Sequence, residues 1–500
     1  MRALWGRMVS CAPVAYRRRA AVCRCLEADY QSAAGCQPAP QGGTFRHWIM
    51  RASVSPLLLL AAAALTAQTN HMQSKLIIVD PGHFHATLLQ KDMYPWVDPR
   101  VTVYAPLGPD LLDYLNRISL FNSRPDNPTR WALDIHTSSD PMAEMLRGHA
   151  GNIVVFTGRN RGKIDRILAA LKAGLNVLAD KPWIIASADL PKLEEALALA
   201  QRKNLAAYDI MTERYEVTSQ LQREFVNDPA VFGALEKGSP REPAVRARSI
   251  HHLMKVVAGT PLRRPPWFFD IAEYGEGLAD VGTHVVDLVQ WTAFPDLALD
   301  YRQDIAVLAG RRWPLQMTRE QFTRVTGDAG FPPALADHIH GGVLDYYCNN
   351  SVAYTLRGVH VELEILWNWE AAGAPSAPGD VYEASFHGTK SRVEIRQGPA
   401  ERFVPEVYIA AANADVPSAV DKRVAALQTR WPGLTAVRSG PDIRIVVPEK
   451  FRVGHEEHFG QVTNRFFEYV TSPKSLPAWE TPYMLVKYAV STKGVEKGKP

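Results

Sequence analysis

The sequence predicts two folded regions: an α/β Rossmann-type domain with a doubly wound parallel sheet, and an α+β domain with an open, mainly antiparallel sheet. We place the first at residues 74–215, where short apolar runs alternate with amphipathic helical segments in the β-α-β-α order of a parallel sheet. We place the second at residues 216–495, where longer segments alternate apolar and polar residues, as strands with one buried and one solvated face do.

Residues 1–67 form a leader that we leave out of the fold. Within it, residues 50–67 are typical of a secretory signal peptide, with a basic start at Met50-Arg51, an apolar run and a small-residue end at Leu65-Thr66-Ala67. The apolar run is too short to span a bilayer, and a buried apolar helix is the alternative. The pattern predicts a periplasmic or secreted protein, or a cytoplasmic one if the leader does not act as a signal.

Charge and cysteine content separate the leader from the remainder. The leader holds eight Arg and two acidic residues, a net charge of +6, whereas the whole chain carries +4, so the difference, −2, belongs to residues 68–500. The body therefore lacks the basic excess of a nucleic-acid-binding protein, and we expect neither a nucleic-acid partner nor a stable membrane anchor. It contains a single cysteine, Cys348, which excludes an internal disulfide and a zinc site built on cysteines.

Apolar runs and helical periodicity predict the strands and helices of the first domain. Strands are expected at residues 76–79, 101–104, 153–156, 176–179 and 205–208. Helices are expected at residues 87–90, 109–118, 164–171 and 190–200.

The turn after the first strand is where such a sheet binds a dinucleotide, and here its glycine fingerprint is degenerate. Gly82 fills the central position of G-x-G-x-x-G, whereas Asp80 and His85 occupy the positions of the flanking glycines. The acidic residue expected after the second strand is also absent, because Ala105-Pro106 follow it. The turn either binds a nucleotide or is an ordinary tight turn in which His83 and His85 form local hydrogen bonds.

A charged pair follows the fourth expected strand. Gly174 can end a helix in left-handed geometry, and the apolar run at residues 176–179 then leads to Asp180 and Lys181. These residues fall at the carboxyl end of the strand, the edge where open α/β sheets bind ligands. Pro182 restricts the backbone of Lys181 to extended geometry, so the lysine side chain projects from a fixed position.

The second domain is expected to combine helices with an antiparallel sheet. Strands are expected at residues 245–250 and 359–369, with a hairpin formed by 381–387 and 391–396. Helices are expected at residues 220–227, 280–291, 459–470 and 482–493. A loop-rich insertion is expected at residues 300–338.

One predicted helix carries polar residues on a shared face. Asp280, His284 and Asp287 are spaced i, i+4 and i+7. A carboxylate one turn from an imidazole can orient it and raise its basicity, which makes His284 a candidate general base. The alternative is a purely structural Asp–His pair.

Two histidine pairs of the sequence are candidate metal ligands, and the three-residue spacing of His455 and His458 allows one helical face. His455-Glu456-Glu457-His458 is not H-E-x-x-H and has no evident third ligand, and His338-Ile339-His340 is similarly isolated. No metal site is predicted.

Two of these stretches together resemble the Gfo/Idh/MocA-type oxidoreductases, which include glucose–fructose oxidoreductase and inositol dehydrogenase. Residues 176–182 are similar to their G-x-H-V-x-x-E-K-P segment, with Asp for Glu, and residues 280–287 are similar to their D-x-G-x-H-x-x-D helix. Residues 155–160 fall where that family has a strand ending at the nicotinamide. The likeness covers about residues 75–295 in order.

The resemblance implies an NAD- or NADP-dependent enzyme that transfers hydride between the cofactor and the CH–OH carbon of a sugar or cyclitol, in a homo-oligomer. Lys181 would contact the nicotinamide ribose and the reacting hydroxyl, His284 would take the hydroxyl proton, and Asp280 would hold His284 or the sugar. The cofactor-binding residues would be Gly82, His83, Phe84, His85, Thr157, Arg159, Asn160, Asp180 and Lys181. The substrate-binding residues would be His252, Lys255, Trp267 and Asp287.

Two alternative functions use the same residues. Glycoside cleavage through transient oxidation would recycle NAD within the site and show no net redox change. A non-catalytic carbohydrate-binding relative would keep the fold without turnover, which the degenerate turn at Gly82 favours and the presence of Lys181, Asp280 and His284 together opposes.

Overall fold

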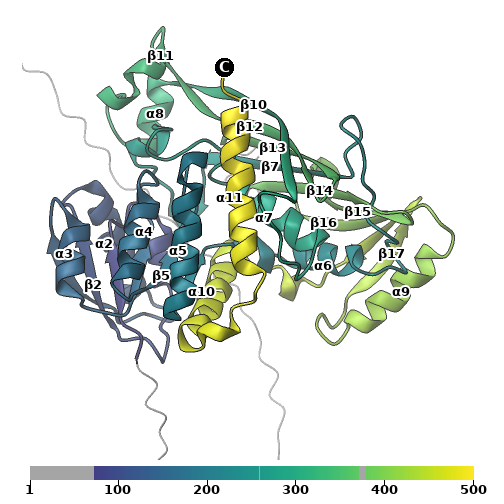
Figure 1. Cartoon of the computed structure of the whole chain (residues 1–500), viewed down its shortest axis with the longest axis horizontal. Helices are drawn as coiled ribbons and strands as arrows, with labels where there is room; N and C mark the ends of the chain where they lie inside the picture. Colours follow the sequence, from purple (N-terminus) through teal and green to yellow (C-terminus); the bar gives the residue numbers. More distant parts are fainter. Residues whose placement is uncertain (1–72, 258, 371–378) are drawn as a thin grey trace, which may run out of the picture. The chain divides into compact units, whose positions relative to one another are not determined.

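The structure, a computed structural model, describes residues 73–257, 259–370 and 379–500 (Figure 1). The predicted leader, with its signal peptide, lies outside the described residues. None of the helices in the described ranges combines the length and the apolar character that a membrane-spanning segment needs.

The first sheet confirms the predicted doubly wound fold. Its six strands are all parallel and follow the order β3-β2-β1-β4-β5-β6, which is that of a Rossmann sheet. The strands are β1 (Leu76–Val79), β2 (Arg100–Ala105), β3 (Ala132–Thr137), β4 (Ile153–Phe156), β5 (Asn176–Ala179) and β6 (Ala207–Asp209). The sequence analysis does not predict β3, because this edge strand is largely exposed and no apolar run marks it.

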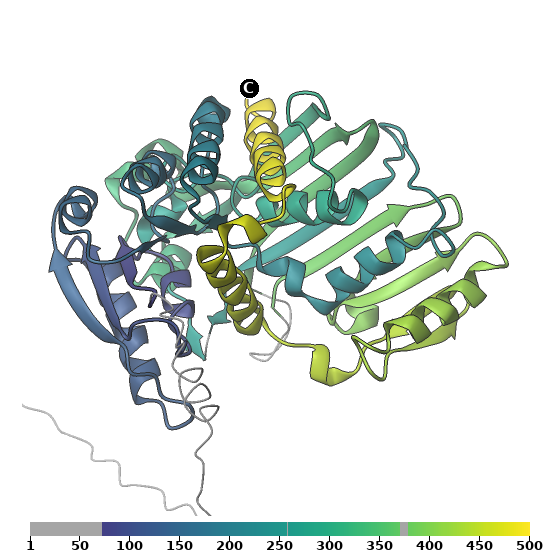
Figure 2. The ribbon, with the colours of Figure 1, turned by 60° about the horizontal axis from the view of Figure 1, so that its bottom comes forward.

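Both faces of the parallel sheet are buried. Ile77 and Val79 of β1 enter one hydrophobic core, whereas Leu76 and Ile78 enter another. Phe459 of α10 belongs to the second core, so a helix near the end of the chain helps to cover the first sheet (Figure 2). The helices of this region are α1 (His85–Leu88), α2 (Pro109–Ser123), α3 (Pro141–Gly148), α4 (Lys163–Lys172), α5 (Leu190–Lys203) and α10 (His455–Thr471).

The second sheet is mainly antiparallel, as predicted. Its ten strands follow the order β10-β12-β13-β7-β14-β15-β16-β18-β17, with β11 paired to β12. Among the described strand pairs of this sheet, β13–β7 is parallel and the others are antiparallel. The strands are β7 (Val245–Met254), β10 (Ile305–Thr318), β11 (Ile339–His340), β12 (Val343–Leu356), β13 (Val359–Glu370), β14 (Val381–His387), β15 (Ser391–Arg396), β16 (Glu406–Ala411), β17 (Thr435–Ser439) and β18 (Asp442–Val446).

One face of this sheet is apolar and the other is charged. Leu363 of β13 is buried, whereas its neighbours Glu362 and Glu364 point the other way and pair with Arg246 and Arg248 of β7 at 3.1 and 3.0 Å. The helices that contact strands of this sheet are α6 (Val217–Val226), α7 (Gly282–Ala293), α8 (Arg319–Thr326), α9 (Val416–Leu427) and α11 (Glu480–Lys497).

The predicted loop-rich insertion at residues 300–338 is wrong. Most of it forms β10 and α8. β10 contains Gly310 and Pro314, which are depleted in strands, and its register with β12 shifts twice. Because β10 lies at the edge of the sheet, a proline without a donor is tolerated there.

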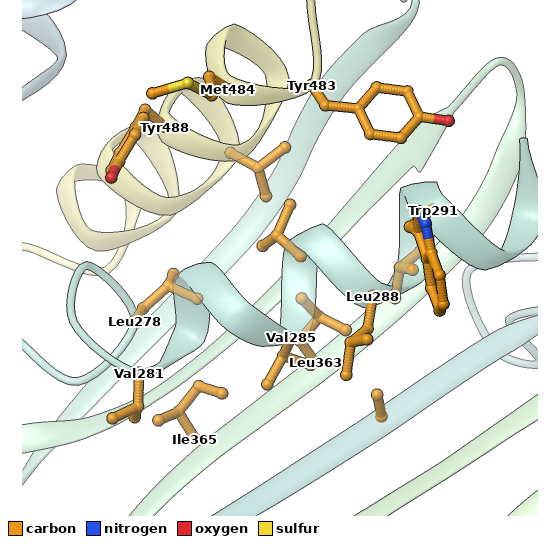
Figure 3. Close-up of a cluster of buried hydrophobic side chains, with 14 of the residues drawn as sticks. Leu278, Val281, Val285, Leu288, Trp291, Leu363, Ile365, Tyr483, Met484 and Tyr488 are labelled. Atoms are coloured by element: carbon orange, nitrogen blue, oxygen red, sulfur yellow. The ribbon is translucent and has the colours of Figure 1, made fainter. Parts of the chain in front are cut away.

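Helices α7 and α11 pack together over the buried face of the second sheet (Figure 3). Val285 and Leu288 of α7 lie above Leu363, and Met484 and Tyr488 of α11 lie on the other side of α7. The helix that carries the predicted base is therefore held between the sheet and the last helix of the chain.

Close approach of α11 to β10 depends on glycine, which gives a test of this packing. A Cβ added to Gly310 would lie 2.3 Å from the carbonyl oxygen of Gly494 and 2.9 Å from the backbone nitrogen of Gly498. Gly310→Ala should lower the free energy of unfolding by about 1–3 kcal/mol, because backbone atoms have to separate. A denaturant titration measures this change.

The control is Gly460→Ala within α10, where an added Cβ meets nothing within 4 Å. This variant should gain about 0.5–1 kcal/mol from helix propensity. Stabilisation by both alanines would contradict the close packing of α11 on β10.

Candidate functional site

A cleft of about 800 Å³ opens at the carboxyl ends of β1, β2 and β4. Gly82, Ala105 and Arg159 line it from the parallel sheet, and Trp267 and Leu335 line it from the second domain. This edge of an open α/β sheet binds ligands, and the volume lies within the range of about 300–1,000 Å³ that ligand pockets have. The cleft is the first candidate for a binding site.

The turn after β1 departs from the glycine fingerprint but keeps its tight geometry. Asp80, in the first glycine position, has a φ of +49°, in the left-handed region that Asp tolerates better than most residues. A Cβ on Gly158, in the turn after β4, would lie 2.4 Å from the carbonyl oxygen of Asp80. The two turns therefore meet at a distance that requires glycine at 158. The sequence analysis does not select Gly158, although a glycine directly after a buried strand is the signal that marks it.

Trp267, predicted to contact substrate, lies over this turn. A Cβ on Gly82 would come within 2.7 Å of its ring. Its indole N–H donates to Asp110 Oδ2 at 2.9 Å, and the Arg159 guanidinium lies 4.9 Å from its ring centre. The sequence analysis does not select Asp110. This residue, near the start of α2, places a carboxylate shortly after β2, although the acidic residue expected at the end of β2 is absent.

A buried ion pair joins the two domains, and neither of its residues, nor His284, lines the cleft. Lys181 Nζ lies 2.5 Å from Asp280 Oδ1, and both side chains are less than a tenth exposed. Lys181 follows β5, and Asp280 lies in the turn that precedes α7. The predicted helix that includes Asp280 begins two residues later, at Gly282, and the Lys181–Pro182 peptide bond is cis.

His284 lies in the first turn of α7, and no carboxylate among the described residues orients it. Asp280 pairs with Lys181 instead, and His284 Nδ1 is buried with no hydrogen-bond partner among the described residues. Burial, followed by the charges of Lys181 and Lys487, holds the pKa of His284 well below its ordinary value. The imidazole is therefore neutral near pH 7. Because buried polar atoms rarely lack a hydrogen-bond partner, we expect its Nδ1 to bond to a ligand.

Two imidazoles contact the Asp180 carboxylate: that of His83, in the turn after β1, and that of His85, the first residue of α1. Its Oδ2 lies 2.7 Å from His83 Nδ1, and its Oδ1 lies 2.9 Å from His85 Nδ1. Burial lowers the pKa of His83 to about 3, against the pull of Asp180. Burial alone would raise the pKa of Asp180, but His85 and His83 hold it well below its usual range. Phe84, between the two histidines, is buried in the core that contains β1 residues.

The segment after β4 binds the second domain through its polar atoms. Asn160 Nδ2 donates to the carbonyl oxygen of Tyr274 at 2.6 Å. Lys163 Nζ donates to Asn160 Oδ1 at 2.6 Å and to the Asp180 carbonyl at 2.9 Å, and burial lowers the pKa of Lys163 to about 7. The Thr157 hydroxyl is buried without a hydrogen-bond partner in the described part of the chain.

His252 and Lys255 converge on Asp380, which the sequence analysis does not select. Lys255 Nζ lies 2.7 Å from Asp380 Oδ2, the backbone N–H of His252 donates to Oδ1 at 3.1 Å, and His251 Nδ1 lies 2.8 Å from Oδ2. Burial alone would raise the pKa of Asp380, but His251 and Lys255 hold it well below its usual value. Burial also raises the pKa of nearby Glu213 to about 7, with help from Glu216 and Asp380.

Asp287, predicted to bind substrate, lies in a buried ion network instead. Arg214 holds both of its oxygens, at 2.5 and 2.7 Å, and a third nitrogen of Arg214 binds Glu480 at 2.6 Å. Lys487, completely buried, lies 2.7 Å from Asp209 and 3.5 Å from Asp287. Paired this way, Asp287 has structural partners on both sides and positions α7 against α11.

The two histidines of α10 have different neighbours. His455 stacks on His85 with ring centres 5.6 Å apart, whereas His458 Nε2 lies 3.7 Å from Glu216 Oε2. His340 lies 2.9 Å from Asp345 at an exposed position.

The buried network can be tested with two lysines that each bridge two aspartates. Lys487→Met removes the cation between Asp209 and Asp287 and should lower the free energy of unfolding by about 3–5 kcal/mol, because uncompensated charge stays buried. Exposed Lys192, which lies 2.9 Å from Asp165 and 3.3 Å from Asp189, is the control.

Lys192→Met should leave the denaturation midpoint close to that of the wild type, since solvent already screens its ion pairs. Denaturant titrations compare the two variants. Equal midpoints for both would show that the Lys487 network does not stabilise the fold.

Comparisons with known proteins identify relatives of the chain. The family described as "Putative oxidoreductase C terminal domain" matches residues 221–499. The crystal structure of "a putative oxidoreductase" from Parabacteroides merdae ATCC 43184 is 42% identical, with a TM-score of 0.81, and covers 85% of this chain and 97% of that chain. Levoglucosan dehydrogenase in complex with NADH has the same fold at 13% identity and a TM-score of 0.53, covering 85% of this chain and 97% of that chain. No curated protein matches the chain.

Proposed function

We propose that this chain, which belongs to the oxidoreductase family of that C-terminal domain, is an NAD(P)-dependent enzyme that transfers hydride to or from a hydroxyl-bearing carbon of a sugar or cyclitol. The observation that carries the proposal is the Lys181–Asp280 pair, which sits at the carboxyl edge of the sheet one helical turn before His284. The glycoside-cleavage and binding-protein alternatives gain no support from the comparisons.

The cleft fits a dinucleotide in place and volume. Gly82 and Gly158 add no side chain of their own to the two turns, although the Trp267 ring packs on Gly82. The buried Thr157 hydroxyl lacks a partner in the described residues. Arg159 provides a cation for the pyrophosphate, although it lies 3.7 Å from Asp80 and 3.3 Å from a second carboxylate, that of Asp110. The NADH complex of levoglucosan dehydrogenase supports the same class of cofactor.

We assign the cofactor contacts to the residues around these turns and the end of β5. They are Gly82, His83, Phe84, His85, Thr157, Arg159, Asn160, Asp180 and Lys181. Trp267, packed on Gly82, stands at the nucleotide end of the cleft, so we assign it there and not to the substrate.

The chemistry follows from three side chains of this chain. The nicotinamide, when bound, accepts or supplies the hydride. Lys181 brings positive charge to the place where the substrate hydroxyl becomes an oxyanion, and Asp280 holds that ammonium in position. His284 is neutral, and its buried Nδ1 has no hydrogen-bond partner within the described residues, so we assign it as the general base that takes the hydroxyl proton.

Substrate hydroxyl groups would meet the polar cluster on β7. Asp380 orients the Lys255 ammonium and accepts from the backbone N–H of His252, whose Nδ1 lies 3.6 Å from the same carboxylate. The ammonium and the imidazole can donate to a ligand rich in hydroxyl oxygens. Asp287 is already held by Arg214 and Lys487, so we do not assign it to the substrate.

The proposal predicts a bound nucleotide and a lysine-dependent turnover. Denatured wild-type protein should release NAD or NADP, detected by mass spectrometry, or bind one of them on titration. With a panel of sugars and cyclitols, Lys181→Met should lower the turnover number by about 10²–10³-fold, because the developing oxyanion loses its cation. Absorbance of the reduced nicotinamide measures turnover.

Lys192→Met, which removes an exposed lysine, is the matched control and should retain wild-type turnover. A wild-type protein that neither contains nor binds either nucleotide would refute the proposed function. Unchanged turnover in Lys181→Met would refute the role of Lys181.

A further inference from the structure

Two histidines and an aspartate form a compact cluster next to the cleft. The ligating atoms of His83, His85 and Asp180 all lie within 4.8 Å of one another. We propose that this cluster binds a divalent transition-metal ion of the Zn²⁺ class. The proposal goes beyond the nicotinamide chemistry and does not depend on it.

The donor set is one that such ions prefer. Two neutral imidazoles and one carboxylate are the protein ligands of several catalytic zinc sites and of the two-histidine, one-carboxylate iron sites. Both histidines direct Nδ1 toward the same carboxylate, His83 at 2.7 Å from Oδ2 and His85 at 2.9 Å from Oδ1. Bonds of about 2.1 Å separate neighbouring ligand atoms by about 3.0 Å around an octahedral ion and by about 3.4 Å around a tetrahedral one, so these His–Asp distances are close to the octahedral value and would lengthen around a tetrahedral ion.

The ligands are held by rigid parts of the fold. The Asp180 backbone N–H donates to the carbonyl of Phe156 at 2.8 Å, and its own carbonyl accepts from Lys163 Nζ at 2.9 Å. His85 lies in α1 and stacks on His455 with an interplanar angle of 20°. Ligands fixed in this way lose little freedom when an ion binds.

The site has an open side. His83 lines the cleft and its side chain is 10% exposed, whereas His85 and Asp180 are each 4% exposed and lie deeper. Three protein ligands with one accessible side leave coordination positions for water or for a ligand oxygen, as in catalytic and not in closed structural metal sites.

Of the two histidine–Asp180 contacts in the cluster, hydrogen bonding explains one. His85 Nδ1 forms a hydrogen bond with Asp180, but His83 Nδ1, although close to the carboxylate, makes no hydrogen bond of acceptable geometry with any described residue. A bridging ion would satisfy this buried nitrogen. The two neighbouring lysines oppose a cation, yet Lys181 is neutralised by Asp280 and Lys163 is bound to carbonyl oxygens.

The test counts metal on the protein itself. Full-length protein purified without a histidine tag is stripped with a chelator, dialysed against Zn²⁺ and analysed by mass spectrometry for metal per chain. The wild type should bind one ion that His83→Gln and Asp180→Asn bind at least about tenfold more weakly, since each variant lacks one ligand. Zn²⁺ should also raise the thermal unfolding midpoint of the wild type but not of His83→Gln, by preferential binding to the folded state.

The matched control is His340→Gln, which removes an exposed histidine whose Nδ1 lies 2.9 Å from Asp345, a similar pair without a third ligand. This variant should bind Zn²⁺ as the wild type does. His83→Gln is the decisive variant, because the His83 side chain lines the cleft whereas Asp180 is buried. The unfolding midpoint of His83→Gln verifies that this variant is folded. A wild type without bound Zn²⁺, or full Zn²⁺ binding by His83→Gln, would overturn the proposal. Neither readout needs nucleotide or turnover, so failure here is distinct from failure of the proposed function.

Discussion

Buried charges have to be paired inside the fold, and this requirement determines how α7 and α11 meet the parallel sheet. An isolated ion in the interior costs several kcal/mol, and three buried cations here, Lys181, Arg214 and Lys487, have carboxylate partners on other elements. Lys181 at the end of β5 pairs with Asp280 before α7, and Arg214 and Lys487 share Asp287 within α7. These pairs connect residues far apart in the sequence, and they set the position of α7 relative to the end of β5.

The same pairs explain the environment of His284. His284 lies between Asp280 and Asp287 in the sequence, but each of these carboxylates is bound to cations from other elements. The imidazole is buried, and its Nδ1 has no hydrogen-bond partner among the described residues. Burial is the main cause of its lowered pKa, and the positive charges of Lys181 and Lys487 lower the pKa further. The proposed general-base role of His284 rests on this neutral imidazole, whose Nδ1 has no hydrogen-bond partner among the described residues.

The degenerate glycine turn has a physical account in the structure. Asp80 adopts the left-handed geometry of the first glycine, and Gly158 from the adjacent strand end allows the close approach that follows. His85, in the third glycine position, turns inward to Asp180. The departures from the fingerprint therefore build a polar cluster beneath the cleft, while the central Gly82 keeps the turn free of a side chain.

The sequence by itself determined the order of the first domain's strands and helices apart from β3 and α3, because apolar periodicity within a segment indicates burial. It also selected Lys181 after a predicted strand and His284 within a predicted helix, since these positions follow from local pattern. It did not reveal the edge strands β3 and β10, whose exposed or glycine- and proline-containing residues lack that pattern.

Only the tertiary structure decided which charges pair. Asp280 binds a lysine 99 positions away instead of the histidine one turn along, Asp287 belongs to a structural network, and Asp380 appears beside His252. No local signal marks such partners, because the energy of a buried ion pair depends on distance in space and on exclusion of water, and neither quantity is a property of a segment read alone.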